Sequence, residues 1–101
     1  MTTRLAALIV IVACGGQDVN PLLPRADAPP DIASACELAS HRCSRCHSLD
    51  RILRARITEP REWQGYVHKM RLMPSSGIPP EEEPTITSCL VYRTRGIEGQ
   101  P

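Results

Sequence analysis

The apolar residues of this chain fall into four separate stretches, and their spacing predicts the elements of the fold. The first stretch, residues 5–13, is an unbroken apolar run. In the second, four apolar residues recur at helical spacing along residues 31–42: Ile32, Ala35, Leu38 and Ala39. This stripe predicts a helix of about three turns. Asp31 is its expected N-cap, because the carboxylate can accept hydrogen bonds from free amides of the first turn.

The third and fourth stretches lie in the second half of the chain. Trp63, Val67 and Met70 stand at positions i, i+4 and i+7, which places them on one face of a helix. Residues 85–93 are rich in β-branched side chains and favour a strand by local propensity. They follow three glutamates and Pro84, which suit the first turn of a helix, and Gly96 is a suitable end for one. The local pattern alone therefore leaves helix and strand open here.

The N-terminal apolar run has the form of an export signal. Arg4 precedes it, and its nine apolar residues are too few to span a bilayer, which takes about 20 in a helix. Residues 11–14, Ile-Val-Ala-Cys, resemble the lipobox of bacterial lipoproteins. That resemblance implies cleavage before Cys14 and attachment of a lipid to its sulfur. Ordinary cleavage nearby, with Cys14 left as a spare thiol, is the alternative.

These features divide the chain into three parts. Residues 1–13 are expected to be a lipoprotein signal peptide. Residues 14–30, rich in proline, glycine and aspartate, are expected to be a lipid-anchored flexible tether, and residues 31–101 the folded domain. The domain is then exported to the periplasmic or cell-surface side of a membrane, which it contacts through the lipid anchor.

The composition indicates that the domain needs a bound group to complete its core. The chain has no phenylalanine, and Trp63, Tyr66 and Tyr92 are its only aromatic residues. A domain of this size buries only about 60% of its unfolded surface and is usually supported by a disulfide, a metal or a cofactor. The formal net charge of +1 excludes a protein that binds nucleic acid through a strong positive field.

The sequence Cys43-Ser44-Arg45-Cys46-His47 supplies the chemistry for such a group. Two cysteines separated by two residues can form thioethers with the two vinyl groups of one haem, and the adjacent His47 can bind the iron. A thioredoxin-like motif would need alternating strands and helices around it, and a zinc site a second paired cluster. The motif therefore predicts one covalently attached haem c.

A wider resemblance extends from residue 33 to residue 93. The Cys-x-x-Cys-His motif, then Trp63-x-x-x-Val67-x-x-Met70, then Ser76-Gly77-Ile78 and an acidic start to the last helix, resemble bacterial class I c-type cytochromes. The resemblance implies a small all-α fold, the class I cytochrome c fold, with N- and C-terminal helices crossing around one haem. It also implies that the last stretch is a helix.

The resemblance leaves the second axial ligand of the iron open. In relatives with the Trp-x-x-x-Val-x-x-Met pattern, the methionine that corresponds to Met70 resembles the ligand, and Met70 is preferred. Met73, four residues before Gly77, matches mitochondrial-type relatives instead, and His68 or an open position remains a further alternative. Trp63 and Val67 are expected to be walls of the haem pocket.

Cys36 and Cys89 remain once the haem and lipid cysteines are assigned. They lie in the two helices that cross in class I cytochromes, so the resemblance implies a disulfide between them in an oxidising compartment. Two small buried thiols are the alternative.

The function implied is a single-electron carrier, not an enzyme, in a respiratory or dehydrogenase-linked chain. Its partner would be a redox protein such as a dehydrogenase, an oxidase or another cytochrome. A haem-based sensor or ligand-binding lipoprotein with an open sixth position is the first alternative. A structural metal or disulfide lipoprotein without haem is the second.

Overall fold

The structure, a computed structural model, describes residues 9–10 and 20–98. Within these residues it contains helices and no strand: α1 (Pro30–Cys43), α2 (Asp50–Arg54), α3 (Pro60–Arg71), the short 3-10 helix η1 (Pro80–Glu82) and α4 (Glu83–Glu98). The all-α class is therefore confirmed for the described part of the chain. No helix in this part is both long and apolar enough to cross a membrane. Cys14 and most of the expected signal peptide lie outside the described residues.

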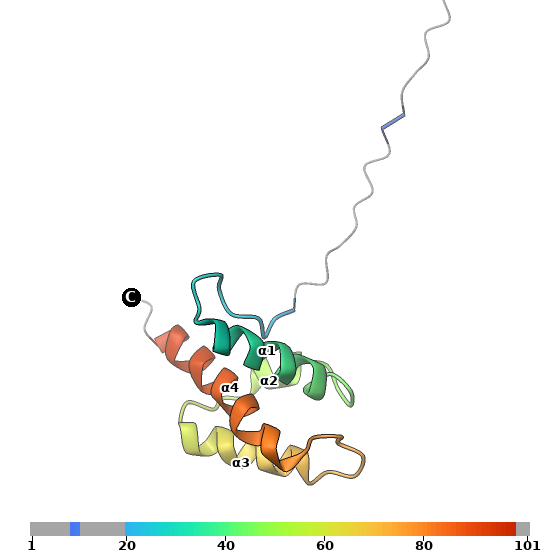
Figure 1. Ribbon diagram of the computed structural model, residues 1–101, viewed down its shortest axis with the longest axis vertical. Helices are drawn as coiled ribbons and strands as arrows, with labels where there is room; N and C mark the ends of the chain where they lie inside the picture. The colour runs from blue at the N-terminus through green and yellow to red at the C-terminus, as the bar shows by residue number, and fades with distance from the viewer. Residues whose placement is uncertain (1–8, 11–19, 99–101) are drawn as a thin grey trace, which may run out of the picture.

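Helix α4 is the centre of the domain, with α1 on one side of it and α3 on the other (Figure 1). Ile86, Cys89 and Leu90 follow helical spacing along α4 and are almost wholly buried. They share one core with buried residues of the other helices and loops: Leu22, Ala35, Cys36, Ala39, Ile52, Trp63, Val67 and Ile78. Burial of this face outweighs the strand preference of the β-branched residues, so residues 85–93 are helical.

Helix α1 agrees with the expected stripe but begins differently. Its first residue is Pro30, and Asp31 lies within the first turn instead of at the N-cap, so that expectation was wrong. Proline at the first helical position needs no amide partner and already has a helical φ. Asp31 still faces the positive end of the helix dipole. The helix ends at Cys43, which is the first residue of the Cys-x-x-Cys-His motif.

Helix α4 also differs from expectation at its end. Gly96 was expected to end the helix, but α4 continues to Glu98. A glycine ends a helix when its backbone turns to a left-handed conformation, whereas Gly96 keeps a helical one. Its cost inside a helix is only about 1 kcal/mol relative to alanine, which the rest of α4 tolerates.

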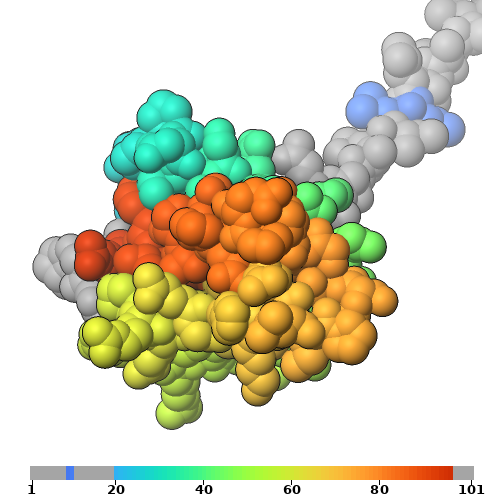
Figure 2. Space-filling view, turned by 60° about the horizontal axis from the view of Figure 1, so that its bottom comes forward, coloured from blue at the N-terminus to red at the C-terminus, as the bar shows by residue number. Residues whose placement is uncertain are grey.

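The folded domain starts earlier than residue 31. Leu22, which the sequence analysis assigned to the tether, is fully buried in the core. Burial of one leucine side chain contributes about 1.5–3 kcal/mol, enough to hold a short segment in place. In the space-filling view, the N-terminal part of the domain (cyan) covers one side of α4, coloured orange to red (Figure 2). The boundary near residue 30 is therefore corrected: the described residues from Asn20 onward belong to the domain.

Candidate functional site

The Cys-x-x-Cys-His motif lies in the turn between α1 and α2. Cys43 is half-buried and Cys46 is exposed, and both are free thiols. Burial raises the pKa of the Cys43 thiol from 9.0 to about 11. Because the thiolate is the reactive form of cysteine, Cys43 is protected against stray oxidation and alkylation at neutral pH.

A groove of about 650 Å³ opens beside the motif, and residues from three elements line it. His47 comes from the motif, Arg51 from α2, and Tyr66 and Met70 from α3. The fold thus brings His47 and Met70, two of the sequence-predicted ligands, to the walls of the same groove.

The His47 ring is oriented by its neighbour. Its Nδ1 lies 2.9 Å from the carbonyl oxygen of Ser48, which accepts a hydrogen bond when Nδ1 carries the proton. A proton on Nδ1 leaves the lone pair on Nε2, and a backbone carbonyl is the usual partner for the second nitrogen of a metal-binding histidine. In that tautomer, Nε2 of His47 is available to bind a metal.

Tyr66 is a groove residue that the sequence analysis did not select. Its hydroxyl is buried and has no hydrogen-bond partner among the described residues. Burial raises the pKa of Tyr66, and the nearby Cys43 raises it further while Arg51 lowers it. A buried hydroxyl without a partner costs about 1–3 kcal/mol. Tyr66 therefore contributes a groove wall while its own hydroxyl is buried and unpaired among the described residues.

Trp63 and Val67 do not line this groove. Both are buried in the core, and the indole Nε1–H of Trp63 donates to Oγ1 of Thr94 at 2.8 Å. The Trp63 ring packs edge-to-face on Tyr66, with ring centroids 5.6 Å apart. Trp63 therefore supports Tyr66 from behind, and Tyr66 lines the groove. Its place between Trp63 and Met70 on the same helical face was the signal available in the sequence.

The three candidates for the second axial position have different surroundings. Met70 packs partly against the core and lines the groove with His47. Met73 lies in the turn after α3, is 45% exposed and does not line the groove. His68 is exposed, and its Nδ1 lies 3.1 Å from Glu83. Of the three, Met70 lines this groove together with His47.

The motif also touches the loop after α3. Gly77 has a left-handed φ of 68°, and a Cβ atom there would lie 2.1 Å from Nη1 of Arg45. Only glycine permits both this backbone conformation and this close approach. The guanidinium of Arg45 thus covers the loop that carries Met73, and this contact joins the loop to the motif.

Two ion pairs fix the start of α4 beside the site. Arg42, the residue before Cys43, forms a bidentate pair with Glu82 at 2.7 and 2.9 Å. Glu83 accepts hydrogen bonds from Arg71 and His68. The hydrogen bond from Arg42 lowers the pKa of Glu82, and the hydrogen bond from Arg71 is the main cause that lowers the pKa of Glu83. These pairs connect the ends of α1 and α3 to the same turn.

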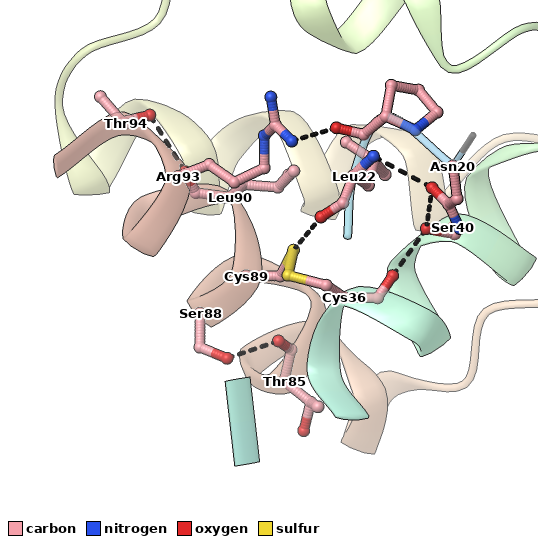
Figure 3. The surroundings of a disulfide bond; sticks show 11 residues. Asn20, Leu22, Cys36, Ser40, Thr85, Ser88, Cys89, Leu90, Arg93 and Thr94 are labelled. Carbon is pink, nitrogen blue, oxygen red and sulfur yellow. Dashed lines mark hydrogen bonds between the residues drawn. A yellow bond between two sulfur atoms is a disulfide. The ribbon is translucent and has the colours of Figure 1, made fainter. Parts of the chain in front are cut away.

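A disulfide joins Cys36 of α1 to Cys89 of α4, the pairing that the resemblance to class I cytochromes implies (Figure 3). The two Cα atoms are 5.0 Å apart, and both side chains have no exposed surface. The bond fixes α1, which delivers Cys43, to the central helix.

A second and larger hollow, about 810 Å³, lies over α3 and α4. Its walls include Gly65, Val91 and Tyr92, but neither a motif residue nor a methionine. The candidate site is therefore the groove beside the motif, which the His47 imidazole and the Met70 thioether line together.

No family model, curated protein or solved structure matches this chain. Among the described residues, no group of three histidine, cysteine, aspartate or glutamate side chains gathers as ligands for a bare metal ion.

Proposed function

We propose that this chain is a mono-haem c-type cytochrome that carries single electrons in the groove between His47 and Met70. The observation that supports this most strongly is the shared groove: His47 of a Cys-x-x-Cys-His motif and Met70 of α3 line it together. Both cysteines of the motif are free thiols in the turn beside it.

The cysteines would make the attachment covalent. Each thiol would hold one vinyl group of the haem through a thioether bond. The spacing of Cys43 and Cys46 suits the two vinyl groups of one macrocycle.

The axial ligands would come from two elements that the fold already holds in place. His47 offers Nε2 and Met70 offers its thioether sulfur, and a Met/His pair raises the reduction potential relative to other ligand sets. When bound, the haem supplies one-electron exchange at its iron. Helices α1 and α3 both pack on α4, so the two ligand-bearing segments are supported by one rigid element. Ligands that stay in place in both oxidation states favour a carrier over a catalyst.

The Cys36–Cys89 disulfide supports export of the chain. A disulfide between α1 and α4 requires an oxidising compartment. We propose in addition that Cys14 carries a lipid after removal of the signal peptide, which anchors the domain to a membrane. The partner is then a redox protein at that membrane, such as a dehydrogenase, an oxidase or another cytochrome.

The test is expression of the full chain together with the machinery that attaches haem c. The wild type should keep a haem stain on a denaturing gel and gain the mass of one haem. The double variant Cys43→Ala/Cys46→Ala should lose both signals. Wild type without covalent haem would end the proposal. Rapid binding of carbon monoxide by the reduced holoprotein would instead support the ligand-binding alternative.

A further inference from the structure

The segment Asn20–Pro24, here called the strap, crosses the Cys36–Cys89 disulfide. Leu22 of the strap has no exposed surface, and its carbonyl oxygen lies 3.9 Å from the Sγ atom of Cys89 (Figure 3). A disulfide sulfur carries no hydrogen, so this approach is a packing contact. The strap is thus part of what separates the disulfide from solvent.

Few contacts hold the strap, and they reach both helices that the disulfide joins. Oδ1 of Asn20 accepts from the Leu22 amide at 3.0 Å and lies 2.9 Å from the Ser40 hydroxyl. That hydroxyl also lies 2.7 Å from the Cys36 carbonyl, and its single hydrogen serves one acceptor at a time. On the α4 side, Arg93 donates to the carbonyl of Pro21. Among the described residues, one buried side chain and a few polar contacts therefore secure the segment.

A segment held this way opens at lower free energy than the helical core. Exposed or weakly packed segments undergo local opening far more often than whole domains unfold. The strap belongs to no helix, so it can leave without breaking the backbone hydrogen bonds of α1 or α4. Its departure removes Leu22 from Cys89 and leaves the two helices joined.

We propose that the strap gates a thiol-exchange site at the Cys36–Cys89 disulfide, which reacts with external dithiols only when the strap is open. A thiolate of the dithiol attacks Sγ of Cys89, a mixed disulfide forms, and Cys36 leaves as a thiolate that takes up a proton. The second thiol of the dithiol, as a thiolate, then attacks the dithiol's first sulfur atom, which is bonded to Cys89. This attack closes the ring of the reagent and releases Cys89 as a thiolate that takes up a proton. Two electrons pass to the protein, and the dithiol becomes a cyclic disulfide.

Reduction of the disulfide would also affect the candidate site, through α1. Cys36 and Cys43 lie on the same helix, and Cys43 is its last residue. Reduction removes the covalent connection between this helix and α4, so the position of Cys43 then depends on packing and on the Arg42–Glu82 pair. The proposal concerns the strap and the disulfide, and it requires no haem.

The experiment measures the rate at which dithiothreitol reduces the disulfide in the full chain. Thiols that are free at the start are first blocked with one alkylating label. A second label then counts, by mass, the two cysteines that dithiothreitol releases. Asn20→Ala should accelerate reduction about tenfold because its hydrogen bonds are lost. Leu22→Ala should accelerate reduction about thirtyfold or more because the strap loses most of its buried apolar area.

Two controls separate local opening from unfolding of the whole domain. Leu23→Ala, at a side chain that is 44% exposed, should leave the rate unchanged. Ile52→Ala weakens the core at α2, outside the strap and outside both helices that carry the disulfide, and should lower the urea midpoint without accelerating reduction. Equal acceleration by Ile52→Ala and Leu22→Ala at equal loss of stability would overturn the proposal. Unchanged reduction rates in Asn20→Ala and Leu22→Ala would overturn the proposal as well.

Discussion

Removal of the Cys36–Cys89 disulfide should cost this domain a large part of its stability. The bond closes a loop between positions 53 residues apart. In the chain-entropy model, a loop of this length restricts the unfolded chain by about 14 cal/mol/K, or about 4 kcal/mol at 25 °C. Small domains are typically stable by roughly 5 kcal/mol or little more. The double variant Cys36→Ala/Cys89→Ala should therefore be close to unfolding.

The assay is urea unfolding of the matured full chain, followed by far-ultraviolet circular dichroism. Alanine fits the space that each buried cysteine occupied, so the loss of the cross-link dominates the expected change. Ser34→Ala, on the exposed side of α1, is the matched control and should change stability by less than about 0.5 kcal/mol. A loss below about 1 kcal/mol in the double variant would refute the entropic reasoning, because the unfolded chain would then gain little from the lost cross-link.

Three further predictions concern the surroundings of the groove. The pKa of Glu83 is lowered from 4.5 by its arginine and histidine partners, so its contribution to stability is complete above pH 4.5 and is lost as the pH falls through the folded value. Glu83→Gln should therefore flatten the acid side of the urea-midpoint profile, and an unchanged profile would exclude this pairing. Gly77→Ala should destabilise the fold by about 1–2 kcal/mol, because alanine is strained in a left-handed backbone conformation. The loss should be smaller in a protein that already carries Arg45→Ala. Equal losses with and without Arg45→Ala would show that the guanidinium does not crowd this site. In protein without haem at pH 8, the raised pKa of Cys43 should lower its thiolate fraction about a hundredfold relative to a thiol with a pKa of 9.0. Mass spectrometry should therefore find Cys46 alkylated first. Simultaneous labelling of both cysteines would mean that Cys43 is not desolvated.

The sequence predicted those helices whose burial leaves a regular pattern. The apolar stripe over residues 31–42 and the Trp63–Met70 face both identify helices because one side of each faces α4. The last helix has no such local signal, since its β-branched residues favour a strand until tertiary burial decides between the two. Only the resemblance to class I cytochromes predicted it as a helix.

Other features depend on contacts that no local pattern encodes. Leu22 stands among prolines without any periodicity, so nothing local distinguishes a docked strap from a flexible tether. The motif identified His47 directly, but the choice between Met70 and Met73 depends on how α3 and the turn after it pack beside the motif. Tyr66 lies beside the expected wall residues and was overlooked because Trp63 is the larger aromatic side chain.

The central claim is that His47 and Met70 bind the two sides of one haem iron. The most direct measurement is the weak long-wavelength absorption band that methionine ligation gives to ferric haem, recorded for matured wild type, Met70→Ala and Met73→Ala. If Met70 binds the iron, the band is present in the wild type and in Met73→Ala and absent in Met70→Ala. A band that survives in Met70→Ala, or a wild type without one, would contradict the central claim.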